Sequence, residues 1–60
     1  MSPLAIRQAL RIKREDAATY RRWAGECPVQ GWAAEYTQIA ARLEAEAAEL
    51  EREQQKETVQ

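Results

Sequence analysis

The sequence predicts an all-α fold, an antiparallel two-helix hairpin, from three observations. Apolar residues recur at every third or fourth position between residues 32 and 50, which is the period of one helix face. A second helical pattern fills residues 4–24 without any Gly or Pro. The segment 25–31 between them holds both glycines and a proline. Because the connection is short, the two helices are expected to be antiparallel neighbours in a single domain, residues 1–60.

The first helix is expected to span about residues 3–24. Ser2 is a favourable N-cap residue. Pro3 suits the first helical position, where its missing N–H group costs no hydrogen bond. Gly25 stands where a left-handed C-terminal cap would end the helix.

The turn is expected at about residues 25–29. Cys27 precedes a proline and should therefore be extended, while Pro28 fits either the turn or the first position of the next helix. The second helix, about residues 29–56, is rich in Ala, Glu, Leu, Arg and Gln, which are strong helix formers. The last residues, 58–60, are expected to fray.

Folding the chain at the turn aligns the apolar positions of the two helices, with Tyr20 meeting Tyr36. Lys13 is the exception, since it falls among apolar positions opposite Leu43. It could pair with Asp16, three residues away, or extend its ammonium group to the edge.

The apolar arc of the first helix is wider than one contact line, and Ala5, Ile12 and Trp23 are left over. A 60-residue chain has a small core, and its single cysteine, Cys27, excludes an internal disulfide. We therefore expect a homodimer that forms an antiparallel four-helix bundle. The residues expected in the hairpin or dimer core are Ile6, Leu10, Ile12, Ala17, Tyr20, Trp32, Tyr36, Ile39, Leu43, Ala47 and Leu50.

All four aromatic residues lie on either side of the turn: Tyr20, Trp23, Trp32 and Tyr36. They could form a small core that clamps the end of the hairpin, or a binding hot spot, for which Trp and Tyr are typical. Trp32 lies on the central stripe and is expected to face inward. Trp23 lies at the edge of its apolar face and is the candidate for an outward role.

Charge is divided unevenly along the chain, +4 over residues 1–24 and −5 over residues 25–60. A basic helix beside an acidic one would account for this. Arg7, Arg11, Arg14 and Arg22 share one face of the first helix. Such a row could follow a phosphate backbone, bind an acidic protein surface or simply be solvated. The net charge of −1 is atypical of a nucleic-acid-binding protein.

The composition argues against catalysis and against a metal or cofactor. The chain has no histidine, so Cys27 has no histidine base, and soft zinc ligands are lacking. Glu46, Glu49 and Glu53 cluster on one side of the second helix, but a di-metal carboxylate site would also need histidine. No apolar run approaches 18 residues, so no membrane span is expected. Arg7 and Arg11 interrupt the apolar residues near the N-terminus, so no signal peptide is expected either, and we expect a cytoplasmic location.

These observations predict a small non-enzymatic interaction protein, a regulator or inhibitor of a kind that phages and plasmids also encode. It would bind and occlude a protein partner through Arg7, Arg11, Arg14, Arg22 and Trp23. One alternative is an RNA-binding dimer that uses the arginine row. In architecture, such a dimer resembles the RNA-binding hairpin dimers that control plasmid copy number. Another alternative is a purely structural coiled-coil adaptor.

Overall fold

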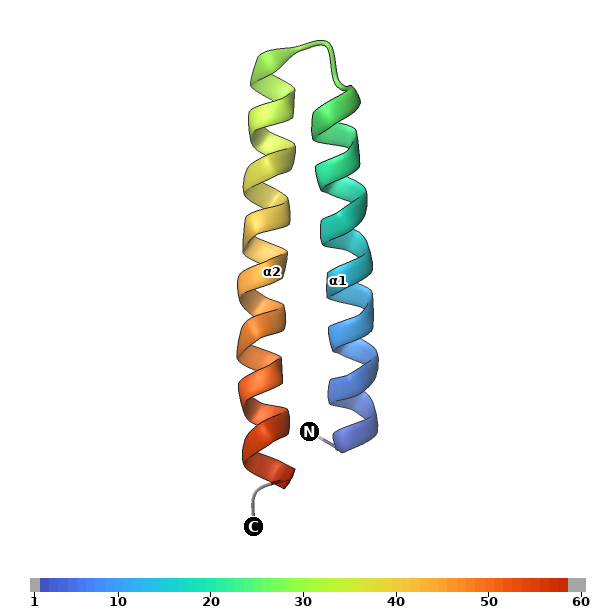
Figure 1. Cartoon of the computed structure of the whole chain (residues 1–60), viewed down its shortest axis with the longest axis vertical. Helices are drawn as coiled ribbons and strands as arrows, with labels where there is room; N and C mark the ends of the chain where they lie inside the picture. The colour runs from blue at the N-terminus through green and yellow to red at the C-terminus, as the bar shows by residue number, and fades with distance from the viewer. Residues whose placement is uncertain (1, 59–60) are drawn as a thin grey trace.

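The chain forms two antiparallel helices that lie side by side along their length (Figure 1). The computed structural model describes residues 2–58, with side chains through residue 56. Helix α1 spans Pro3–Glu26 and helix α2 spans Gln30–Thr58. Together they make a rod of 48 × 14 × 13 Å. The expected all-α hairpin is confirmed.

The start of α1 follows the prediction. Ser2 is the N-cap in an extended conformation, with φ −71° and ψ 154°. Its Oγ accepts a hydrogen bond from the Ala5 N–H at 3.2 Å, and its carbonyl oxygen accepts one from the Ile6 N–H at 3.0 Å. Pro3 occupies the first turn, where the N–H that it lacks is not needed.

The predicted end of α1 at a left-handed Gly25 is wrong. The helix continues through Gly25 to Glu26, and no described residue has a positive φ. The cap is Cys27, which is extended (φ −76°, ψ 125°) and whose N–H donates to the Trp23 carbonyl at 2.9 Å. The cause is Pro28, because a residue before proline is excluded sterically from the helical region. The proline therefore ends the helix, and the glycine is an ordinary helical residue.

Helix α2 begins just after the turn. The Val29 carbonyl accepts the Ala33 N–H at 3.0 Å, and the helix starts at Gln30, which makes Pro28 a turn residue. The helix extends to Thr58, two residues beyond its expected end. Of the residues expected to fray, 59–60 lie outside the described part of the chain.

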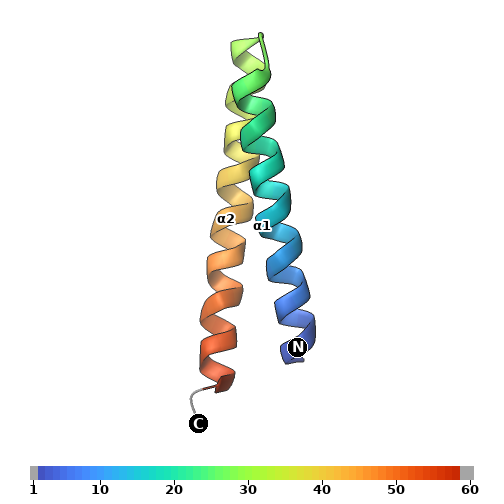
Figure 2. The same ribbon diagram turned by 45° about the vertical axis from the view of Figure 1, so that its right-hand side comes forward.

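The seam between the helices alternates steps of four and three residues, as in an antiparallel coiled coil. The buried side chains are Ile6, Leu10, Ala17, Ala40 and Ala47. Three of the five are alanines, so the core is thin, and two of these, Ala17 and Ala40, lie near mid-length. Toward the termini Ile6, Leu10 and Ala47 cluster with Leu50. Figure 2 shows the helices overlapping near the loop and separating toward this end.

Most of the predicted core residues line this seam, but Trp32 and Ile12 do not. Trp32 is 62% exposed and Ile12 is 57% exposed. The seam keeps a heptad period, so stepping back from Ala47 by sevens reaches Ala40 and then Ala33, which is half-buried. Trp32, one residue earlier, is turned by about 100° onto the flank. Five other predicted core residues are half-buried: Tyr20, Tyr36, Ile39, Leu43 and Leu50.

Candidate functional site

One side of the seam carries ion pairs between the helices. Arg21 bonds Glu44 through two hydrogen bonds, Nε to Oε2 at 2.7 Å and Nη2 to Oε1 at 2.6 Å. Arg14 pairs with Glu51. The two arginines are seven residues apart and so are the two glutamates, which places both pairs on the same side. We call these four residues the ion-pair flank.

Lys13 also pairs across the seam. Its Nζ donates to Glu46 Oε1 at 2.8 Å. Of the two possibilities that the sequence left open, the local pair with Asp16 is therefore not the one that forms. A side chain at a seam position points toward the other helix, and its ammonium reaches the facing carboxylate more directly than one on its own helix. The hydrogen bond from Lys13 lowers the pKa of Glu46, and the nearby charge of Arg42 adds to this.

Ion pairing also shifts pKa values on the ion-pair flank. The hydrogen bonds and charge of Arg21 lower the pKa of Glu44, and Glu44 in turn raises the pKa of Arg21. Each ion pair between the helices of the described chain takes its cation from α1 and its carboxylate from α2. The uneven charge distribution therefore reflects a basic helix beside an acidic one, as expected.

The predicted arginine row is not one free surface. Arg14 is engaged with Glu51, and Arg11 pairs along its own helix with Glu15 at 3.2 Å. Arg7 and Arg22 are exposed and form no ion pair within the described residues. Trp23 lies apart from the row because it follows Arg22 by one residue, a turn of about 100° around the helix. The structure thus divides the predicted partner-binding set between two surfaces.

Three aromatic rings form a cluster near the loop. The Tyr20 and Trp23 ring centroids are 5.4 Å apart, and the rings meet edge to face. Both rings contact Tyr36 of α2 at 5.9 Å. The predicted aromatic clamp is therefore present, but with three members. Trp32 is the more exposed tryptophan, and Trp23, at 43% exposure, is partly packed, which reverses the expected roles of the two.

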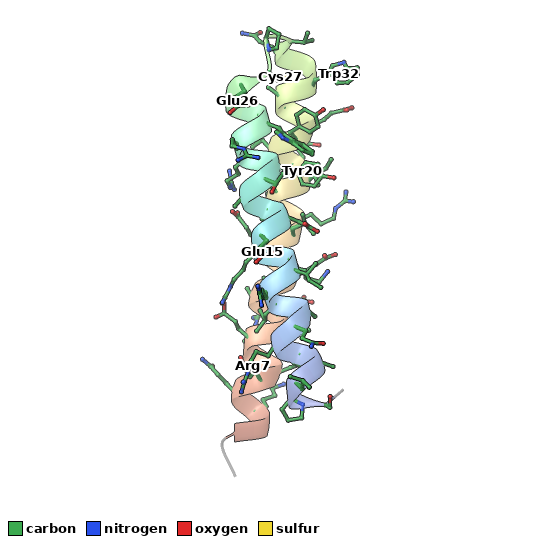
Figure 3. All side chains as sticks on the ribbon, turned by 90° about the vertical axis from the view of Figure 1, so that its right-hand side faces the viewer. Arg7, Glu15, Tyr20, Glu26, Cys27 and Trp32 are labelled. Atoms are coloured by element: carbon green, nitrogen blue, oxygen red, sulfur yellow. The ribbon has the colours of Figure 1, made fainter. Side chains whose placement is uncertain are left out.

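These aromatic residues continue into an exposed apolar strip on the side of the seam opposite the ion-pair flank. Ile12 and Trp23 are eleven residues apart, about three turns, so they project from the same side of α1. Trp32 precedes Tyr36 by one turn and shares its side of α2. Figure 3 shows Tyr20 and Trp32 on the same side of the hairpin. The apolar strip consists of Ile12, Tyr20, Trp23, Trp32 and Tyr36.

An open groove continues this side toward the termini, where the helices separate. Its volume is about 690 Å³. Ala9 and Leu50 contribute its apolar surface, and Ala9 lies two heptads before Trp23 and so on the same side of α1. The predicted glutamate cluster lies here, interleaved with basic residues. The charged residues that line the groove are Lys13, Glu46, Glu49, Arg52, Glu53 and Lys56.

The remaining groups with possible chemistry are the acidic residues and the single thiol. Within residues 2–58, no three potential ligands are grouped so that they could hold a metal ion. Cys27 is a free, half-buried thiol whose Sγ donates to the Val29 carbonyl at 3.5 Å. Neither described helix contains a stretch that is long and apolar enough to cross a membrane. No protein-family model matches the chain, and no curated protein or solved structure matches it either.

Sequence reasoning missed the ion-pair flank. The signal was present, because Arg14 and Arg21 repeat at one heptad and so do Glu44 and Glu51. Matching these repeats across the hairpin would have indicated the pairs.

Proposed function

We propose that the chain is a non-enzymatic interaction protein that docks on another protein molecule through the apolar strip. The observation that carries the proposal is the exposure of three large apolar side chains on one side of the hairpin: Ile12 at 57%, Trp23 at 43% and Trp32 at 62%. By covering a partner's surface the hairpin would block access to it, as a regulator or inhibitor does. We place this activity in the cytoplasm, where a single cysteine such as Cys27 stays reduced.

The strip has the physical character of a binding hot spot. Trp and Tyr bury large areas and dominate the energetics of protein interfaces. Trp23 is held by Tyr20 and Tyr36, so it would lose little conformational freedom on binding. Trp32 is free of this cluster and can adapt to the partner.

The proposal extends to a homodimer in the form of a four-helix bundle. The hairpin buries few side chains larger than alanine, and chains of this size generally need a further source of stability. A partner that uses the apolar strip would then compete with dimerisation.

Binding of RNA by Arg7, Arg11 and Arg14 has less support. Two of these three arginines already form ion pairs with carboxylates. A salt-dependent shift of structured RNA in a gel would favour this alternative. A purely structural adaptor would instead form a stable oligomer without a separable partner.

The test is affinity capture from a lysate of the source cells, with and without nuclease, followed by mass spectrometry. Trp32→Ala is the informative variant, because this side chain is largely exposed and its loss should leave the hairpin folded. Gln38→Ala, exposed on the outer side of α2, is the matched control. We expect a nuclease-resistant partner that the wild type and the control retain and that Trp32→Ala loses.

Two outcomes would overturn the proposal. Loss of every captured protein after nuclease treatment would favour nucleic acid as the partner. Equal capture by Trp32→Ala and Gln38→Ala would show that the apolar strip is not the docking surface.

A further inference from the structure

We infer that, without another partner, a second copy of the chain covers the apolar strip, inverted end for end so that the tryptophans of each copy enter the groove of the other. This inference rests on the proposed function, because it names an occupant of the same docking surface. It adds the relative orientation of the copies and the complementary site, the groove at Ala9 and Leu50.

The chain exposes more surface than a compact protein of its mass would. The chain exposes 4810 Å². A compact monomer of its mass, 6.9 kDa, would expose about 4,000 Å². The excess is about 800 Å², so burying the area that each partner contributes to a standard interface would bring each copy to the exposed surface of a compact monomer.

The shapes at the two ends of the strip are complementary. Near the loop, Trp32 and the exposed part of Trp23 project from the surface. Near the termini, on the same side, the helices separate around the groove, whose apolar surface comes from the small Ala9 and from Leu50. Inverting a second copy brings the projecting end of each chain onto the open end of the other. Both contacts form at once, as a two-fold symmetric interface requires.

The register of α1 agrees with a single two-fold axis at the level of Asp16. This residue lies midway between Ala9 and Trp23, so the axis places the tryptophan at the groove. It also lies midway between Ile12 and Tyr20, so the same axis places the exposed isoleucine on the aromatic cluster.

The register of α2 leads to the same level. The buried Ala17 and Ala40 mark the middle of the seam, next to Asp16. Ala40 is midway between Trp32 and residue 48, two positions before Leu50 at the groove. The same two-fold rotation therefore brings both tryptophans of one copy to the groove of the other.

The opposite orientation, with both loops at one end, fits less well. The tryptophans of the two copies would then meet each other, and neither groove would be filled. The two grooves would face one another with identical charges in register, Lys13 near Lys13 and Glu53 near Glu53, whereas the inverted arrangement brings only Asp16 to the level of Asp16 at its axis. In the inverted arrangement each groove receives apolar rings, which the aliphatic stems and cationic groups of Arg52 and Lys56 can contact.

The experiment combines sedimentation analysis with a distance measurement between nitroxide labels on Cys27, the only cysteine. Cys27 is eleven residues from the level of Asp16, so inverted copies would separate the two labelled positions by about 33 Å along the bundle axis. Copies with their loops together would bring them within about 10–15 Å. We expect a dimer with the long separation, and the short one would overturn the inferred orientation.

Two substitutions test the contact itself. Trp32→Glu and Ala9→Lys each alter one side of the proposed contact, and each should weaken dimerisation by about tenfold or more. Gln38→Glu, on the outer side of α2, is the control and should dimerise as the wild type does. Circular dichroism would verify that each variant stays helical. A dimer that tolerates both Trp32→Glu and Ala9→Lys would overturn the inference.

The result also separates this inference from the proposed function. A wild-type monomer at millimolar concentration that still captures a partner through Trp32 would overturn the dimer alone. A monomer whose capture does not depend on Trp32 would overturn both.

Discussion

Arg21 and Glu44 join the two helices through a pair of hydrogen bonds, at 2.7 and 2.6 Å. They are 23 residues apart in the chain, and the planar guanidinium meets the carboxylate fork to fork. One heptad further from the loop, Arg14 pairs with Glu51 on the same flank. Both side chains of the Arg21–Glu44 pair are about half exposed, so the pair contributes more to alignment of the helices than to stability.

The lowered carboxylate pKa values predict how stability depends on pH. The folded-state pKa values of Glu44 and Glu46 lie below the ordinary value of 4.5, so the folded chain binds fewer protons at these sites than the unfolded chain does. Their contribution is therefore present above pH 4.5 and is lost as pH falls through the folded values. The double substitution Glu44→Gln, Glu46→Gln should lower the Tm modestly at pH 7 and leave it close to that of the wild type at pH 3.

Thermal melts followed by circular dichroism between pH 3 and pH 7 would measure this difference. Glu35→Gln is the control, because Glu35 is exposed and takes part in no ion pair within the described residues. It should show no such pH-dependent difference. A difference between wild type and double variant that persists unchanged at pH 3 would contradict the prediction.

The burial of the small Ala40 in the seam predicts that stability depends strongly on side-chain size at this position. Ala40 is fully buried, whereas its neighbour Ala41 is exposed. Ala40→Leu should lower the free energy of unfolding by about 1–3 kcal/mol, because extra methylene groups would force the backbones apart. Ala41→Leu, with the same chemical change, should alter it by about 0.5 kcal/mol or less. Urea denaturation would compare the two, and equal effects would show that the seam does not pass through residue 40.

Because Gly25 is helical, its replacement by alanine should stabilise the protein, whereas the same replacement at a left-handed cap would destabilise it. A Cβ atom at this position would meet nothing within 4 Å, and its φ is not positive. Gly25→Ala should raise the free energy of unfolding by about 0.5–1 kcal/mol, because alanine loses less conformational entropy on folding. Thermal melts would measure the change. A destabilised variant would mean that residue 25 adopts the left-handed conformation after all.

The sequence was sufficient for the hairpin because two signals coincided. Helical periodicity defined two long elements, and the segment with Pro28 and the two glycines separated them. Ser2 and Cys27 were predicted correctly because their conformations depend on immediate neighbours. The conformation of Gly25 was predicted wrongly, because a glycine permits a left-handed cap without requiring one. The steric effect of Pro28 on Cys27 determines where the helix ends.

The candidate site was harder to predict because it depends on small angular differences. A straight helical period of 3.6 places Trp32 on the stripe, whereas the heptad seam selects Ala33 and leaves Trp32 on the flank. An error of one residue turns a side chain by about 100°, enough to exchange a core position for an exposed one. For the same reason the sequence did not show that Trp23 and Arg22 lie on different surfaces, or that Arg14 pairs with a residue of the other helix.

The position of Lys13 within the apolar seam predicts how its replacement would change stability and association. Its side chain is 31% exposed and pairs with Glu46. Lys13→Leu should raise the free energy of unfolding by about 1 kcal/mol, because the leucine would continue the apolar seam between Leu10 and Ala17. It should also broaden the range of oligomers seen by light scattering, since a polar residue at a seam position restricts register and association at a cost in stability.

Glu46→Gln separates the two effects of Lys13, because it removes the carboxylate and leaves the lysine in place. This variant should be less stable than the wild type, since the ammonium would lose its charged partner. If Lys13→Leu were also less stable than the wild type, the ion pair would matter more than continuity of the apolar seam. The order Lys13→Leu above wild type above Glu46→Gln in Tm would instead show that Lys13 is retained at the expense of stability, which favours a role in restricting how the hairpin associates.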